Sequence, residues 1–278
     1  MKLKGIGRSR NIEDRRQVSA RGAGVKLGGV GLLVVLAIGY FAGIDVTELL
    51  ENGPATSSQP RPISAEEQRA ADFSASVLGT TETVWTAVFR DQLDRTYQPP
   101  ILVLFSGQTA SPCGGASGAT GPFYCPADQK AYLDTAFFAT LAHRLGAGGD
   151  FAAAYVIAHE VAHHVQGQLG ILHAVDQRRQ QLNQVEANAL TVKLELQADC
   201  LAGVWARAVD GLLEPGDLEE ALNAARQIGD DRLQQAAGQI PQPHTFTHGT
   251  AAQRVRWFSL GYQSGVIGDC DTFRANRL

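Results

Sequence analysis

The sequence lacks the basic excess that is typical of nucleic-acid-binding proteins. It has 24 Lys and Arg against 28 Asp and Glu, which gives a formal net charge of −4. Residues 1–26 hold eight of the basic side chains and only two acidic ones, so the rest of the chain is more acidic than the whole. We therefore expect no nucleic-acid partner. The chain also lacks internal repeats, and its 278 residues are enough for one sizeable core and at most two domains.

Residues 27–44 contain no charged side chain. A helix over this run, at about 1.5 Å per residue, approaches the roughly 30 Å hydrocarbon core of a bilayer. Basic residues precede the run and acidic residues follow it, so the positive-inside rule predicts a cytoplasmic N-terminus. No small-x-small cleavage site ends the run, because Tyr40 and Phe41 occupy the candidate positions. We therefore predict an uncleaved, single-pass anchor in the cell membrane, with the following domain periplasmic or extracellular.

Cysteine is scarce: the chain has four and no Cys-x-x-Cys pair. Because no such pair is present, we do not expect the cysteines to form a tetrathiolate zinc site. An even number of cysteines in a domain outside the cytoplasm favours two disulfides. We predict Cys113–Cys125, which closes a Gly-rich loop, and Cys200–Cys270, which ties the C-terminal tail to a helix. Other pairings, and free buried thiols, are the alternatives.

The composition along the chain predicts four segments. They are a basic cytoplasmic arm at 1–26, the anchor at 27–44, a Pro- and Ser-rich linker at 45–65 and one globular domain at 66–278. Short apolar runs in this domain predict strands at 101–105, 122–125 and 130–133, a Gly-rich loop is expected at 106–121, and helical spacing prevails elsewhere. The predicted fold class is therefore α+β, mostly helical with a few short strands.

The residues His159, Glu160 and His163 form an HExxH motif that follows an apolar run. Two histidines four residues apart on a helix lie on one face and can bind one zinc ion together. Glu160 is then placed to take a proton from the attacking water. The apolar flanks place the motif in a core, where ionisable groups are costly without a metal or partners. The motif therefore predicts a Zn²⁺ site.

A catalytic zinc usually has three protein ligands and one open position. The metzincin class is excluded, because Gln166 and Leu169 stand where it needs a glycine and a third histidine. A carboxylate on a later helix remains, and the candidates are Glu186, Glu195 and Asp199. Glu195 and Asp199 are four apart, so one can bind zinc while the other holds a ligand histidine by its free N–H. We predict Glu195 as the ligand and Asp199 as the orienting partner, since Glu186 belongs to a polar stretch.

The segments HEVAHHVQ and ELQADCLAG resemble the gluzincin pattern of HExxH with a later ExxxD. The closer resemblance is to the bacterial putative neutral zinc metallopeptidase family. It is carried by GPFYCPADQKAYLD, GDFAAAYVIAHEVAHHVQG, ELQADCLAGVWA and FTHGTAAQRVRWFSLGY, and it covers most of residues 66–278. It implies a zincin-like fold with Glu195 as the third ligand.

In the related membrane endopeptidases, a His-Pro segment with an Arg six positions on follows the ExxxD helix. His248 and Arg254 have this spacing, although Gly249 replaces the Pro. The resemblance makes His248 a candidate donor to the oxyanion, and the alternative is an exposed loop histidine. His244 and His164 are expected to be bystanders.

Together these features predict a membrane-anchored zinc peptidase, an endopeptidase, that hydrolyses peptide bonds with Glu160 as general base. The strand at 130–133 is predicted to be an exposed edge that takes the peptide or protein substrate in extended form. The alternative is a non-catalytic extracytoplasmic binding or assembly module that zinc stabilises through four protein ligands. The sequence predicts neither a specific substrate nor an oligomeric state.

Overall fold

The computed structural model describes residues 1–17, 62–117, 121–143 and 145–278. Helices and strands are both present, as the α+β prediction requires. Four strands form a sheet in the order β1 (Ile12–Asp14), β2 (Ile101–Phe105), β6 (Lys130–Asp134) and β5 (Phe123–Cys125). The first three run parallel, and β5 is antiparallel to β6 at the edge.

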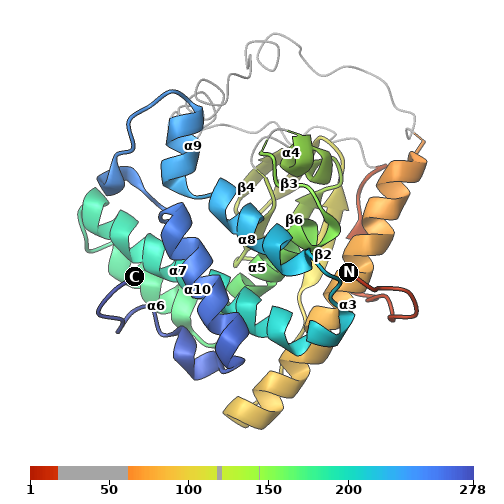
Figure 1. The fold of residues 1–278 in the computed structure, drawn as a ribbon, viewed down its shortest axis with the longest axis horizontal. Coiled ribbons are helices and arrows are strands. Elements are labelled where there is room, and N and C mark those ends of the chain that lie inside the picture. The colour runs from red at the N-terminus through yellow and green to blue at the C-terminus, as the bar shows by residue number, and fades with distance from the viewer. Residues whose placement is uncertain (18–61, 118–120, 144) are drawn as a thin grey trace.

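Helices pack beside this sheet and make up most of the described chain (Figure 1). The helices are α3 (Ala65–Leu93), α4 (Phe137–His143), α5 (Asp150–Gln168), α6 (Ile171–Arg179), α7 (Gln184–Ala208), α8 (Asp217–Gln227), α9 (Asp230–Ala236) and α10 (Ala251–Ser264). Three short 3-10 helices are η1 (Asp210–Leu212), η2 (Pro243–Thr245) and η3 (Ile267–Cys270).

Local sequence signals start the long helices. Ser64 and Glu67 form a capping box at the start of α3, and Asn183 and Glu186 form another at the start of α7. In each box the two side chains satisfy backbone N–H groups that the first helical turn leaves without a partner. Glu186 is therefore an exposed capping residue, which agrees with its rejection as a zinc ligand.

The core is formed by α5 together with the sheet and the helices that pack around α5. Most residues of α5 are buried, and the helix packs against α3, α7 and α8. A helix that is apolar on all sides belongs in an interior, so its sequence accounts for this central position. On β2, Leu102 and Leu104 join this core, while Val103 and Phe105 join a smaller cluster on the other face. This alternation follows from the two-residue period of a strand.

Two expectations for the strands are wrong. Residues 106–121 are not a simple loop, because β3 (Gln108–Ser111) and β4 (Gly114–Ser117) form an antiparallel hairpin there. The strand at 130–133 is not an exposed edge, because β6 lies between β2 and β5. The edge strands of this sheet are β1 and β5. The apolar pattern of β6 reflects burial among neighbours on both sides, which a run of apolar residues alone does not distinguish from an edge.

Both predicted disulfides are present. Cys113 pairs with Cys125 and so connects the β3–β4 hairpin to β5. Cys200 pairs with Cys270 and so connects α7 to η3 near the C-terminus. No free cysteine occurs in the part of the chain that the structure describes.

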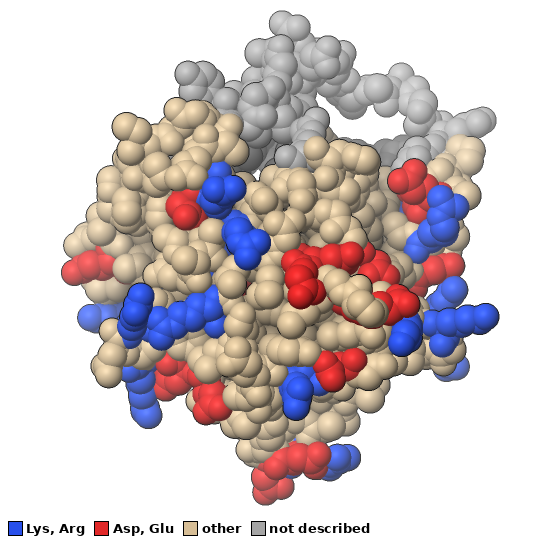
Figure 2. Space-filling view, viewed as in Figure 1, with Lys and Arg blue, Asp and Glu red and all other residues tan. Residues whose placement is uncertain are grey.

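The N-terminal segment packs onto the rest of the protein. Besides the β1–β2 pairing, the Ser9 amide donates to the Ala75 carbonyl of α3 at 2.9 Å. The Met1 amine lies 2.9–3.1 Å from carboxylate oxygens of Asp150, Glu214 and Asp217. Figure 2 shows acidic side chains gathered near the centre of one face, over the region where Figure 1 places the N-terminus. Residues 1–16 are therefore part of the folded unit and not a separate arm.

This packing corrects the predicted membrane topology. The expected anchor at 27–44 lies outside the described residues, and none of the helices within them combines the length and apolarity that a membrane crossing requires. The segments on the two sides of the expected anchor meet in one folded unit, through β1 and β2. A chain that crosses a bilayer once would place them on opposite sides. The prediction of a single-pass membrane protein, and the localisation derived from it, is therefore wrong.

Helices α7 and α10 cross at two glycines. A Cβ atom on Gly261 would overlap the carbonyl oxygen of Cys200, and one on Gly203 would overlap that of Phe258. The backbones can approach this closely only because neither residue has a side chain. This crossing places α10 directly against the helix that carries Glu195 and Asp199.

We expect Gly261→Ala to lower the free energy of unfolding by about 1–3 kcal/mol, because overpacking pushes α10 away from α7. The matched control is Gly211→Ala, since Gly211 is exposed and a Cβ there would meet no atom within 4 Å. Urea denaturation measures both variants. Equal stabilities of the two would contradict the close crossing.

Candidate metal centre

Helix α5 brings the two histidines of the HExxH motif together. The ring centroids of His159 and His163 are 4.8 Å apart, with the planes at 89°. Both side chains are largely shielded from solvent, with 8% and 12% of their surface exposed. Glu160 follows His159 on the same helix and lines the adjoining cleft. The three residues lie together because their spacing on one helix fixes their relative positions.

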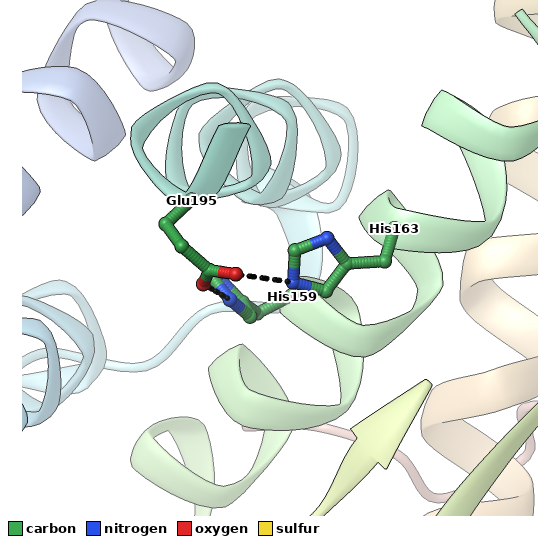
Figure 3. Close-up of side chains that lie close together, drawn as sticks. All are labelled: His159, His163 and Glu195. Carbon is green, nitrogen blue, oxygen red and sulfur yellow. Dashed lines mark hydrogen bonds and ion pairs between the residues drawn. The ribbon is translucent and has the colours of Figure 1, made fainter. Parts of the chain in front are cut away.

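Helix α7 supplies the carboxylate that faces them. Figure 3 shows Glu195 reaching from α7 toward the two imidazoles of α5. Its Oε2 atom lies 3.2 Å from Nε2 of His159, and its Oε1 atom lies 3.5 Å from Nε2 of His163. The structure thus brings together the three residues that the sequence analysis chose as ligands.

The donor atoms fit a zinc ion. One ligand atom from each of these three residues lies within 4.8 Å of the others. Tetrahedral zinc with bonds of about 2.0–2.2 Å separates its ligand atoms by roughly 3.4 Å, close to the distances observed here. Two imidazole nitrogens and one carboxylate oxygen are also a typical donor set of catalytic zinc. Within the described residues, no fourth His, Cys, Asp or Glu joins this group.

The site stabilises positive charge. Burial lowers the pKa of His159, but the hydrogen bonds to Asp199 and Glu195 outweigh this and raise it to about 10. Burial likewise raises the pKa of Glu195, but the charge of His163 and the histidine hydrogen bonds hold it well below its usual range. The carboxylate is therefore ionised, and the imidazoles lie where a cation is favoured.

Asp199 orients His159. The Nδ1 atom of His159 lies 3.0 Å from Oδ1 of Asp199, which is fully buried. A hydrogen on Nδ1 leaves the Nε2 lone pair directed at the metal position. Arg254 donates to both carboxylate oxygens of Asp199 at 2.9 Å, and the Tyr155 hydroxyl donates to Oδ1 at 2.5 Å. The structure thus places Asp199 against the free Nδ1 of His159, where the predicted orienting role needs it, and places Arg254 behind Asp199.

Gln166 orients His163 in the same way. Its Oε1 atom lies 2.8 Å from Nδ1 of His163, and its amide nitrogen donates to the Leu194 carbonyl and the Gln197 side chain. These two bonds fix the amide so that its oxygen faces the imidazole. The sequence analysis used Gln166 only to exclude the metzincin class. Its position three residues after His163, on the same helix face, was the available signal.

His248 lies at the cleft with an aspartate behind it. Its Nδ1 atom is 3.2 Å from Oδ1 of Asp230, and its side chain is 49% exposed. Asp230 also accepts backbone N–H bonds from Thr247, His248 and Gly249. Although burial raises the pKa of Asp230, the bonds from His248 and these amides hold it below its usual range. The sequence analysis missed Asp230, because it precedes the His-Gly segment by eighteen positions.

The remaining histidines differ from each other. His244 is exposed and does not line the cleft. His164 is only 2% exposed and bonds to the Tyr124 hydroxyl and the Gln98 carbonyl. Burial lowers the pKa of His164, so the ring is neutral near pH 7. His164 lies outside the group of candidate ligands, and its interpretation as a bystander overlooks these contacts.

A cleft of about 440 Å³ opens onto the three candidate ligands. Glu160, His248 and Arg254 also line it, and so do Phe123 and Tyr124 of the edge strand β5. Its other walls are mainly apolar and include Phe137, Leu145, Val156, Leu172, Leu194, Ile228 and Leu233. The cleft therefore joins the candidate ligands to β5 between mainly apolar walls.

Comparison with known proteins places these residues in a family. The family model described as "Putative neutral zinc metallopeptidase" matches residues 1–273. The uncharacterized protein YpfJ of Escherichia coli K12 is 47% identical over 284 residues, which cover 98% of this chain and 99% of that protein. The uncharacterized protein Rv2575 of Mycobacterium tuberculosis H37Rv is 47% identical over 195 residues, 66% of this chain and 65% of that protein. No solved structure matches.

We expect Glu195→Ala to lower the zinc affinity of the purified protein by at least tenfold, because one of three ligand atoms is lost. Glu186→Ala is the matched control, since Glu186 is exposed on the same helix. Zinc content after dialysis and competition with a chromophoric chelator measure the two variants. Full zinc occupancy in Glu195→Ala would contradict the assignment.

Proposed function

The chain belongs to the putative neutral zinc metallopeptidase family, and on this premise we propose that it is a zinc-dependent endopeptidase with Glu160 as its general base. The observation that carries the proposal is the arrangement of His159, His163 and Glu195. Their three ligand atoms converge at the bottom of an open cleft, and no fourth candidate ligand joins them among the described residues. This favours an enzyme over a module with structural zinc, which normally has four protein ligands.

His159, His163 and Glu195 would hold the ion, and Asp199 and Gln166 would keep the two imidazoles oriented. A bound Zn²⁺ supplies Lewis acidity toward the scissile carbonyl and a lowered pKa for water. Glu160 lies at the cleft one residue after His159, where it takes a proton from the attacking water. The same carboxyl then delivers this proton to the leaving amine.

His248 stabilises the oxyanion in this proposal. With Asp230 accepting at Nδ1, a doubly protonated ring has its second N–H, at Nε2, free to donate to the developing negative charge. A single donor of this kind contributes roughly 2.7–4 kcal/mol to catalysis. His248 would thus act on the substrate, with Asp230 as its support.

The substrate lies extended along β5, which takes over the role that the sequence assigned to residues 130–133. An edge strand offers backbone N–H and C=O groups to an added peptide strand. Phe123 and Tyr124 of β5 line the cleft together with the metal ligands. Because the flanking walls are mainly apolar, we expect cleavage beside uncharged, apolar side chains. Acidic or basic residues at these positions would lose their hydration without gaining a partner.

A peptide-library digest tests the proposal. We expect the zinc-loaded protein to cleave peptides, a chelator to abolish cleavage, and Glu160→Gln to retain zinc while kcat falls at least 10²-fold, because a general base contributes roughly 10²–10⁴-fold. Mass spectrometry identifies the cleavage positions, and metal analysis verifies the zinc content of the variant. Undiminished cleavage by zinc-loaded Glu160→Gln would contradict the proposed role of Glu160.

We expect His248→Ala to lower kcat roughly 10²–10³-fold with little change in KM, because the lost hydrogen bond forms mainly in the transition state. His244→Ala is the matched control, since His244 is exposed nearby and lies outside the cleft. Steady-state kinetics on one peptide compare the two variants. A change in KM alone would show that His248 binds the ground state and not the oxyanion.

A further inference from the structure

We propose that His164 is a positioning residue that holds the substrate-binding strand β5 against helix α5 through the Tyr124 hydroxyl. This inference rests on the proposed function for the role of β5. The hydrogen bond between His164 and Tyr124 is seen in the structure and does not depend on that function. His164 lies next to the candidate ligand His163 but on another side of α5, where it faces β5 and the chain that leads into β2.

The hydrogen-bond partners of His164 fix its tautomer. Its Nε2 atom lies 2.6 Å from the Gln98 carbonyl oxygen, which can only accept. The same Nε2 atom lies 2.8 Å from Nε2 of Gln168, which itself donates to this carbonyl, and an Nε2–H that donates to Gln98 leaves Nδ1 as an acceptor. The Tyr124 oxygen lies 3.0 Å from Nδ1, so the Tyr124 hydroxyl donates to His164.

Further contacts hold His164 and its partner Gln98 in place. Gln168 of α5 donates from Nε2 to the same Gln98 carbonyl at 2.7 Å and accepts the Gln98 amide at 3.0 Å. The Tyr97 ring packs edge-on against the imidazole, with centroids 5.9 Å apart. His164 is 2% exposed. Because these contacts restrain the imidazole, it can serve as a fixed hydrogen-bond partner for Tyr124.

Strand β5 needs such an anchor. It has only three residues, lies at the edge of the sheet and is paired with β6 on one side. The Cys113–Cys125 disulfide holds its last residue to the β3–β4 hairpin. The Tyr124–His164 bond holds its central residue to α5, the helix that carries the HExxH motif. The distance between β5 and the metal position is therefore set by this bond.

The same bond excludes a direct role for Tyr124 in the reaction. Its hydroxyl bonds to Nδ1 of the buried His164, although Tyr124 is also one of the residues that line the cleft. Loss of the bond loosens the strand on which the peptide lies and leaves Glu160, His248 and the candidate ligands in place. We therefore expect substrate binding to weaken and the chemical step to be unchanged.

Tyr124→Phe and His164→Leu test the inference. We expect each to raise KM roughly three- to tenfold, the range for one neutral hydrogen bond, with kcat within about twofold of the wild type. His164→Gln should restore KM, because the amide can accept from Tyr124 and donate to Gln98. The control is Tyr132→Phe, which removes the Tyr132–Asp128 hydrogen bond on the neighbouring strand, outside the cleft. A lowered kcat with unchanged KM in Tyr124→Phe would overturn the positioning role.

Hydrogen exchange provides a readout that does not depend on peptidase activity. In the zinc-loaded Glu160→Gln background, we expect Tyr124→Phe to accelerate amide exchange in residues 122–126 at least threefold and to leave α5 unchanged. Faster exchange confined to β5 supports the anchor, even if the zinc-loaded protein cleaves no peptide and the proposed function fails. Unchanged exchange in both Tyr124→Phe and His164→Leu overturns the inference.

Discussion

The buried carboxylate of Asp199 is the interaction on which the geometry of the site depends. A buried charge costs several kcal/mol unless an opposite charge and hydrogen bonds compensate it. Arg254 from α10 supplies the opposite charge, and Tyr155 and His159 from α5 supply further bonds. Helices α5 and α10 are thus both bonded to one side chain of α7. Glu195 lies one turn before Asp199 on that helix, so the interaction that fixes the framework also places the third candidate ligand.

The packing around α7 makes this arrangement stiff. The glycine crossing lets α10 approach closely enough for Arg254 to reach Asp199. Cys200, the residue after Asp199, is bonded to Cys270, whose carbonyl also accepts from the Gln197 side chain. These contacts join α7 to segments more than fifty residues away. A metal site requires its ligands to be held to within about 0.5 Å, and such long-range contacts supply that restraint.

The sequence predicts those parts of the site that depend on local spacing. His159, Glu160 and His163 share one helix, and the pair Glu195 and Asp199 shares another, so the helical repeat alone places each group. The supports that the sequence analysis missed or undervalued, Gln166, Asp230 and His164, gain their meaning from chain segments that only the fold brings near. The position of residues 130–133 inside the sheet was also missed, because it depends on pairing with strands that only the fold brings near. The single-pass topology was predicted wrongly because only the three-residue strand β1, too short to show a pattern, reveals that the N-terminal segment joins the domain.

The charges around the candidate ligands argue for a divalent cation. With both histidines neutral, the carboxylates of Glu160, Glu195 and Asp199 and the guanidinium of Arg254 leave two net negative charges at the end of the cleft. Without a metal, protons on the imidazoles compensate them, which is the reason that the pKa of His159 is raised. One Zn²⁺ would balance the two charges without these protons and free both imidazoles to bind it. The same balance accounts for the position of Glu160: a cation held by the candidate ligands would offset the charge of a carboxylate that lines the adjoining cleft.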